Sequence, residues 1–123
     1  MIRPLAFVVL TLLPCITLAQ DQTQQAETTT SALIRWQDRI TSVLTDVEIH
    51  AGTPVDLGPL TVELKECRYP QGAINQDAFA LLQVYDGQAD AQIFLGWMVA
   101  SSPAMNAVEH YRYDIWVLRC IAP

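Results

Sequence analysis

Two cysteines, Cys67 and Cys120, set the strongest limit on how this chain folds. The 123-residue sequence contains a third cysteine, Cys15, which lies in an N-terminal leader and is expected to be removed with it. An even pair of cysteines in an exported domain predicts a disulfide bond, because thiols are oxidised outside the cytoplasm. The pair is too widely spaced for a local C-x-x-C redox motif. Closing a loop of roughly 50 residues stabilises a fold by about 4 kcal/mol, which is comparable to the net stability of a small domain.

The evidence for export is in residues 1–19, which have the three parts of a secretory signal peptide. Arg3 gives a positive start, Leu5–Leu13 is an apolar run, and the segment ends in the small residue Ala19. The apolar run stops at Pro14, so it is shorter than the ~20 residues that a membrane-spanning helix needs. We therefore predict cleavage after Ala19, a periplasmic location and no stable membrane span after cleavage.

The folded domain is expected to start after a polar segment. Residues 20–31 contain no large apolar side chain, which predicts a disordered polar spacer. Residues 32–123 then form a single domain, since a chain of this length supports one hydrophobic core. Aspartate and glutamate outnumber lysine and arginine by 13 to 7. This acidic balance argues against nucleic acid or an anionic membrane surface as a partner.

Short apolar runs separated by turn residues predict an all-β domain. The expected architecture is a small antiparallel sandwich or partly closed barrel of six to seven short strands, with one disulfide. Pro103 favours the start of one short helical turn near residues 103–108. The main apolar runs occupy residues 32–37, 43–50, 60–67, 78–85, 91–100 and 111–120.

Strand parity adds finer predictions. In the run 60–67, alternation places Cys67 on the polar side of the strand. The disulfide would then join two neighbouring strands and close a small apolar layer outside the main core. The run 91–100 is apolar on both sides, which predicts a central strand that is covered on both faces. Trp97 and Trp116 are expected in the core.

The side chains with the clearest chemical potential occur between Ser101 and Asp114. Serine, histidine and aspartate are the residue types of a nucleophile, a base and the group that orients the base. On a regular strand His110 and Asp114 would lie about 13 Å apart, beyond hydrogen-bond reach, unless a bulge or bend brings them together. Both serines also suit the start of a helical turn. We therefore predict no catalytic residues, and the candidate binding surface comprises Ser101, Ser102, Glu109, His110, Tyr113 and Asp114.

The sequence has no motif for a metal ion or a cofactor, and we predict neither. His50 and His110 are far apart, and neither belongs to an H-x-x-x-H pair. The five glycines form no phosphate-binding loop. Trp36 and Tyr85 are the candidates for lining a ligand pocket, because aromatic rings give a large contact area with few rotatable bonds.

Four short motifs follow one another in the C-terminal part of the chain. They are Gly96-Trp97-Met98, Ala100–Pro103, Ala107–His110 and Tyr113–Cys120. Their order, with the earlier stretch from Gly52 to Cys67, resembles a family of exported alphaproteobacterial proteins known as domain of unknown function 2155. The resemblance covers most of residues 32–120. It implies an envelope location and the same two cysteines, and it implies no activity.

Within this resemblance, Glu109, His110, Tyr113 and Asp114 stand at positions that match the family's motif. The sequence departs from the family at Tyr111-Arg112, where His-Pro-Val-Tyr is usual, so the resemblance does not imply a rigid loop after His110. The loop is either a binding surface or the corner on which the fold closes.

Three classes of function fit these observations. The first is a non-catalytic envelope protein that binds or helps to assemble another envelope component through exposed parts of the 101–113 loop. The alternative is a binder of a small molecule or glycan, or an inhibitor of an envelope enzyme, since an acidic chain attracts a basic target. The third is a hydrolase that uses His110. The expected partner is thus an envelope protein or a small ligand.

Overall fold

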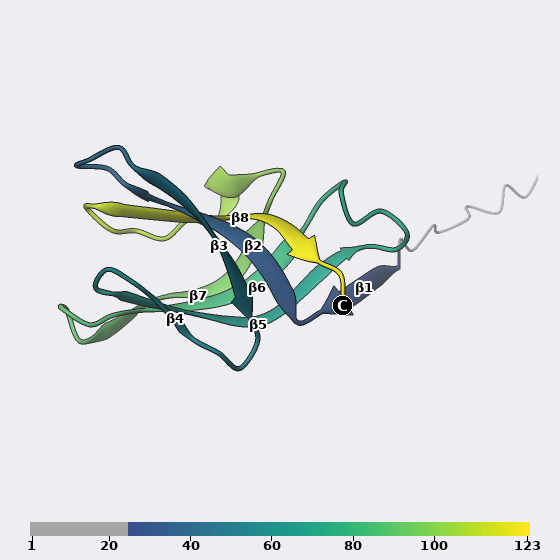
Figure 1. Ribbon diagram of the computed structural model, residues 1–123, viewed down its shortest axis with the longest axis horizontal. Coiled ribbons are helices and arrows are strands. Elements are labelled where there is room, and N and C mark those ends of the chain that lie inside the picture. The colour runs from purple at the N-terminus through teal and green to yellow at the C-terminus, as the bar shows by residue number, and fades with distance from the viewer. Residues whose placement is uncertain (1–24) are drawn as a thin grey trace, which may run out of the picture.

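The computed structural model describes residues 25–123, so the predicted leader, the cleavage site after Ala19 and residues 20–24 of the predicted spacer lie outside the described part. Within this part, eight β-strands form two antiparallel sheets that pack face to face (Figure 1). The predicted all-β sandwich is confirmed, with eight strands instead of six to seven. The elements are β1 (Ala26–Thr29), β2 (Ser31–Asp38), β3 (Leu44–His50), β4 (Val55–Leu57), β5 (Leu60–Pro70), β6 (Phe79–Asp86), β7 (Ala91–Val99), the 3-10 helix η1 (Pro103–Met105) and β8 (Tyr113–Ile121).

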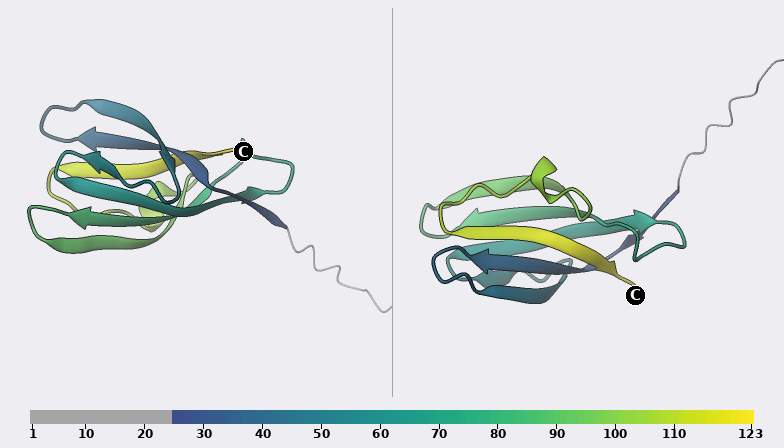
Figure 2. Two further views of the ribbon diagram at one scale, coloured as in Figure 1. Left: turned by 60° about the horizontal axis from the view of Figure 1, so that its bottom comes forward. Right: turned by 90° about the horizontal axis from the view of Figure 1, so that it is seen from above.

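The two sheets differ in size. The larger sheet has the strand order β1-β5-β6-β7, with β4 paired to another stretch of β5, and the smaller sheet has the order β3-β2-β8. Both layers are visible in the two views of Figure 2. The loop 100–112 runs from β7 to β8, and it therefore connects an edge strand of one sheet to an edge strand of the other.

The core lies between the sheets because alternate residues of the strands are apolar and point inward. In β6 the residues Ala80, Leu82 and Val84 are buried, while Leu81 and Gln83 between them face outward. Both sheets contribute to the core. Its largest fully buried side chains include Ile34, Ile49, Leu60, Leu64, Leu82 and Met98.

A bulge in β5 turns Cys67 into the core. The pairing of β5 with β6 shifts between Leu64 and Glu66, so Lys65 is an extra residue and the inward and outward sides exchange beyond it. Cys67 has no exposed surface. The prediction that it lies on the polar side of the strand is wrong, because strict alternation does not allow for an inserted residue.

A second bulge does the same for Cys120. Strand β8 pairs Val117 with Ile34 and Arg119 with Leu33, which leaves Leu118 as the extra residue. The Cα atoms of the two cysteines are 5.7 Å apart, and the disulfide is confirmed. It joins β5 of one sheet to β8 of the other inside the main core, and not in a separate outer layer as predicted.

Strand β1 corrects the prediction that residues 20–31 form a disordered spacer. Its backbone pairs with the end of β5, where Glu27 lies opposite Tyr69. The Tyr69 hydroxyl donates to Glu27 Oε2 at 2.7 Å, and the Thr29 hydroxyl donates to the Ile121 carbonyl at 2.6 Å. Backbone pairing and a few polar contacts hold this strand, so it needs no large apolar residue. The prediction is wrong for the residues that form β1 and the start of β2.

Strand β7 is an edge strand, so the prediction of a central strand covered on both faces is also wrong. Phe94 and Met98 point into the core. Trp97 is half-buried on the outer face of the larger sheet, and Trp116 is half-buried in the smaller sheet. The prediction that both belong to the core is therefore wrong. Trp36 instead packs against the core.

The helical turn is shorter than predicted. It covers only Pro103–Met105, because Ser102 makes no side-chain capping hydrogen bond and Asn106 already has extended backbone angles.

Candidate functional site

The structure does not bring the candidate residues of the 101–114 segment into one site. The Ser101 hydroxyl donates to Asp77 Oδ2 at 2.7 Å, and the Ser101 backbone N–H donates to Asp77 Oδ1 at 3.1 Å. His110 contacts Asp86 instead. Since β6 runs between Asp77 and Asp86, the two contacts are about 25–30 Å apart at ~3.3 Å per residue. Ser101 and His110 therefore lie at opposite ends of the sandwich.

His110 is buried at the point where the loop enters β8. Its side chain is only 5% exposed, and its Nε2 lies 3.3 Å from Asp86 Oδ2. Its Nδ1 accepts the backbone N–H groups of Arg112 at 3.1 Å and Tyr113 at 3.2 Å. Because Nδ1 is an acceptor, the hydrogen of a neutral ring lies on Nε2, which is close to the Asp86 carboxylate but makes no hydrogen bond to it. Both ring nitrogens thus face groups of the protein, and the neighbouring carboxylate is Asp86 rather than Asp114.

Asp114 belongs to one of two matching ion pairs that join the end of β2 to the start of β8. Arg39 binds Asp114 through two nitrogens, with Nε 2.8 Å from Oδ2. Arg112 binds Asp38 in the same two-pronged manner, at 3.1 and 2.8 Å. Each strand end thus supplies one arginine and one aspartate, and the four charges cancel.

These ion pairs fix the loop after His110. The Arg112 guanidinium donates hydrogen bonds to Asp38 and lowers the pKa of that carboxyl to about 2. The Arg39 backbone N–H donates to the Arg112 carbonyl at 2.8 Å. The ion pair and the backbone contact of Arg112 thus hold this segment of the loop.

The remaining candidate residues have different surroundings. Tyr113 is 7% exposed and belongs to the core, with its ring 5.3 Å from that of Trp36. Gly58, whose φ is 60°, leaves room for the Tyr113 hydroxyl, since an added Cβ would lie 3.1 Å from it. Ser102 is half-buried and Glu109 is exposed. Of the predicted binding surface, only Glu109 and part of Asp114 are open to a partner at this end.

An apolar tip, which the sequence prediction missed, lies at the same end. It consists of Ile40, Val43 and Leu44 from the β2–β3 turn and Tyr111 from the loop, which are 68%, 56%, 51% and 77% exposed. The hydrogen bond from Arg39 N to the Arg112 carbonyl extends the β2–β8 pairing by one step, and so it brings the two segments together. Figure 1 shows the β2–β3 turn beside the start of β8.

The turn that carries the tip has a fixed conformation. Asp38 Oδ1 accepts the Ile40 N–H at 3.0 Å, and the Asp38 carbonyl accepts the Ser42 N–H at 2.7 Å. Ser42 has a positive φ of 63°. The tip is therefore held in one shape before any partner arrives. A shallow hollow beside it is lined by Arg39, Ala107, Val108, Glu109, His110, Tyr111 and Asp114.

A second apolar surface covers the outer face of the larger sheet. Alternation sends one set of side chains of β6 and β7 away from the core, and Leu95 among them is 57% exposed. Cross-strand pairing places Leu81 opposite Trp97, and the Arg68 guanidinium lies 4.9 Å from the centre of the Trp97 ring. We call this surface the outer patch. It comprises Phe79, Leu81, Leu95, Trp97 and Val99, whereas Ile93, the extra residue of a bulge in β7, packs against the core.

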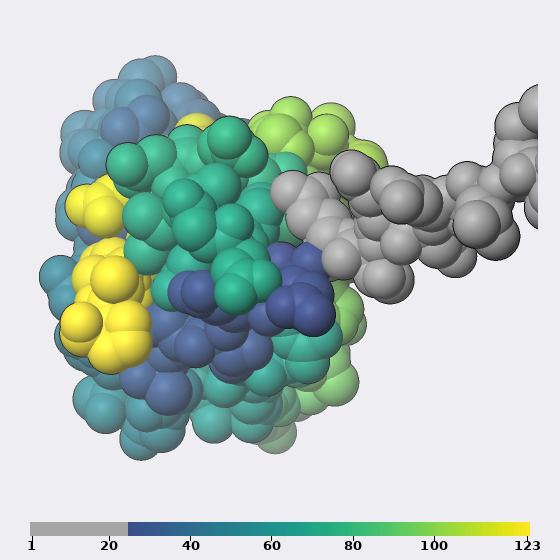
Figure 3. Space-filling model, turned by 90° about the vertical axis from the view of Figure 1, so that its right-hand side faces the viewer, coloured from purple at the N-terminus to yellow at the C-terminus, as the bar shows by residue number. Residues whose placement is uncertain are grey.

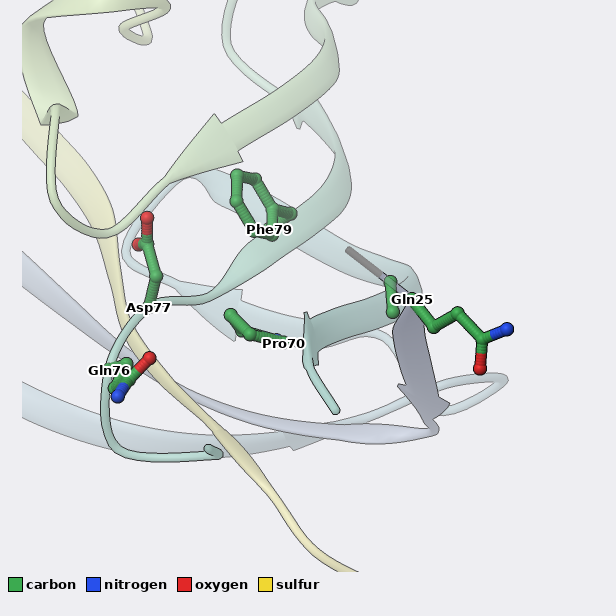
Figure 4. A pocket seen from close by; sticks show the side chains of 6 residues that line it. Gln25, Pro70, Gln76, Asp77 and Phe79 are labelled. Atoms are coloured by element: carbon green, nitrogen blue, oxygen red, sulfur yellow. The ribbon is translucent and has the colours of Figure 1, made fainter. Parts of the chain in front are cut away.

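A groove adjoins the outer patch where β1 meets the loop after β5. One hollow of about 400 Å³ is lined by Gln25, Ala26, Pro70, Gln76, Asp77 and Phe79. Another of about 280 Å³ shares Ala26 and Phe79 and reaches Arg68 and Trp97. Figure 3 shows this end of the molecule, and Figure 4 shows Phe79 and Pro70 between Gln25 on one side and Asp77 on the other. Neither Trp36 nor Tyr85, the predicted pocket residues, lines these hollows.

The described residues, 25–123, contain neither a metal-binding cluster nor a membrane-spanning helix. No group of three or more histidine, cysteine, aspartate and glutamate residues in this range is placed to hold a metal ion. No helix in the same range is long and apolar enough to cross a membrane.

Comparison with protein families matches residues 32–120 to the family described as "uncharacterized protein conserved in bacteria", domain of unknown function 2155. The chain belongs to this family. The matched residues run from β2 almost to the end of β8 and include both cysteines, the loop and the apolar tip, whereas β1 lies before them.

One relative of this DUF2155 protein is "Uncharacterized protein RP359" of Rickettsia prowazekii (strain Madrid E). The two are 28% identical over 86 residues, which cover 68% of this chain and 56% of the relative. The chain thus spans little more than half the length of the relative. No solved structure matches the chain.

Proposed function

We propose that this DUF2155 protein is a non-catalytic periplasmic protein that binds or helps to assemble another component of the bacterial envelope. The observation that carries the proposal is the apolar tip: four large apolar side chains project from one end of the sandwich. A group of exposed apolar residues is characteristic of an interaction site. The periplasmic location is supported by the signal-like leader and by the disulfide buried in the core.

The tip has the shape and stiffness of a docking element. Its turn is closed by hydrogen bonds to Asp38, so binding costs little conformational entropy. The charges beside it are paired, Asp38 with Arg112 and Arg39 with Asp114, so a partner can cover them without meeting an unpaired charge.

The charge of the chain restricts the partner. The net charge is −6, and Glu109 stands exposed beside Tyr111. Electrostatic complementarity therefore favours an envelope protein that offers an apolar groove with a basic rim. The proposed surface keeps part of the 101–113 loop and adds the β2–β3 turn to it.

The groove beside Phe79 supports a second candidate function, the binding of a glycan or another small polar ligand. It combines an aromatic ring with the amides of Gln25 and Gln76, and this combination of apolar and polar lining is typical of ligand sites. NMR titration with soluble peptidoglycan fragments tests the candidate. Shifts confined to residues that line the groove support it, whereas an unchanged spectrum at millimolar ligand rules it out for this class of ligand.

The main proposal is tested by site-specific photo-crosslinking in cells. A photoreactive amino acid replaces Ile40 in the tip, and in a matched control strain it replaces Leu95, which is similarly exposed on the outer patch. We expect position 40 to give a defined adduct with another envelope protein and position 95 to give no adduct with that protein.

A substitution within the tip completes this test. Leu44→Lys places a charge on an exposed residue without disturbing the core, so the domain should fold normally and the adduct from position 40 should disappear. If position 40 gives no adduct, or if the adduct survives Leu44→Lys, the tip is not the binding surface.

A further inference from the structure

The outer patch is an apolar surface that binding through the tip does not use, although its residue Phe79 also lines the groove. Leu95 and Trp97 lie on β7 and face away from the core. The corresponding face of the smaller sheet is more mixed, with Arg35 bound to Asp46 through Nε at 2.6 Å and Trp116 opposite Arg35. The more apolar face is the one better suited to being covered.

The charge distribution favours a second copy of the chain as the cover. Molecules with a net charge of −6 repel one another over most of their surface. The outer face of the larger sheet is less acidic, because four charged side chains of β5 are paired on it: Lys65 with Glu63 at 2.9 Å and Arg68 with Glu66 at 2.6 Å. Asp56, on β4 beyond β5, lies on the same face and accepts the Thr61 hydroxyl. Two copies that meet through β6 and β7 leave these charges outside the contact.

The layout of the face is compatible with two-fold symmetry. Its charged side chains are on β5, and its apolar side chains are on β6 and β7. A two-fold axis that runs parallel to the strands, between the two facing sheets, sets β6 and β7 of one copy against β7 and β6 of the other. This is an isologous interface, in which both copies use the same surface. The charged half then forms a rim on each side.

The apolar half of the face sets the size of the contact. Its two strands, with a spacing of about 4.8 Å and each about 28 Å long, cover roughly 270 Å² in projection. Two copies together therefore bury less than the ~1,000 Å² of a stable interface, and the contact has the size of a weak, reversible dimer.

We propose that two copies of this protein pack face to face through their outer patches and form a dimer. The two sheets lie about 10 Å apart, as packed sheets do, and the apolar tips remain free. The dimer is independent of the proposed partner, because the two use different surfaces.

Sedimentation velocity on the mature protein, with Leu95→Lys and Leu44→Lys as matched variants, tests this proposal. We expect a monomer–dimer equilibrium with a dissociation constant on the order of 1–100 μM. Leu95→Lys should weaken the dimer by roughly tenfold or more, because it buries a charge in the centre of the interface. Leu44→Lys introduces the same charge at a similarly exposed position in the tip, and it should leave the dimer unchanged.

Salt dependence gives a second readout. Raising NaCl from about 0.1 M to about 1 M shortens the screening length from about 10 Å to about 3 Å. This should strengthen the dimer, because salt screens the repulsion between the acidic surfaces outside the interface, whereas the apolar contact persists. A protein that stays monomeric above the stated range overturns the proposal, as does a dimer that Leu95→Lys leaves intact or that added salt dissociates. None of these results bears on the photo-crosslinks from position 40.

Discussion

Breaking the bond between Cys67 and Cys120 is expected to lower the free energy of unfolding by about 4 kcal/mol. The two residues are separated by 53 positions in the sequence, and the loop-entropy relation gives about 4 kcal/mol at 25 °C for a loop of this length. A small domain has a net stability of about 5–15 kcal/mol. The loss is therefore a large share of the total, and at the lower end of that range the reduced protein is close to unfolding.

Urea unfolding followed by tryptophan fluorescence measures the effect, since Trp36 packs against the core. Three samples separate its causes: the oxidised wild type, the reduced wild type and the double alanine variant. The reduced wild type keeps both buried sulfur atoms, so its loss relative to the oxidised protein reports the bond alone. The further loss in the alanine variant reports packing. The urea dependence should also become steeper, because an unfolded chain without the bond is less compact.

The reasoning assumes that the bond acts by restricting the unfolded chain. Complete reduction must therefore be shown by thiol titration under the conditions of the experiment. A fully reduced wild type that loses less than about 1 kcal/mol would refute the loop-entropy argument for this domain.

Three further changes have defined outcomes. His110→Ala should cost about 2–4 kcal/mol in urea unfolding, because two buried backbone N–H groups lose their acceptor, and a loss below 1 kcal/mol would contradict the buried role of the ring. Asp38→Asn should remove part of the acid denaturation of the wild type: the pKa of Asp38 falls from 3.8 in the unfolded chain to about 2 in the fold, so its contribution is present above pH 4 and is lost as the pH falls toward 2. If the two proteins show the same dependence of thermal stability on pH between 2 and 5, the Arg112 pairing does not stabilise the fold. Gly96→Ala should displace Asn106, whose Nδ2 would lie 2.7 Å from the new Cβ, and faster amide exchange in residues 100–108 with little change in β6 would show it.

Local sequence patterns predicted the class of fold but not the position of every strand in it. Alternation identified most of the strands. The disulfide followed from the predicted export and from the even number of cysteines after the leader. The bulges at Lys65 and Leu118 could not be predicted, because an inserted residue leaves no mark in a pattern of period two. The edge position of β7 depends on which strand becomes its neighbour, and an apolar run does not contain that information.

The site was harder to predict than the fold. His110 was a candidate because of its residue type, but its contact with Asp86 could not be predicted, because the two residues are distant in sequence. The tip was missed for a similar reason. Ile40 and Tyr111 become neighbours only through the pairing of β2 with β8, and each alone is an ordinary exposed residue in a turn.

The disulfide also places a condition on the order of events during folding. Cys67 lies in β5, but Cys120 lies in β8, which is preceded in the chain by all the other strands described here. Strand β8 pairs only with β2, from the first part of the domain. The bond can therefore form only after the chain through Cys120 is available for folding. Until then Cys67 is a free thiol, so oxidation completes folding in this domain and cannot guide its earlier steps.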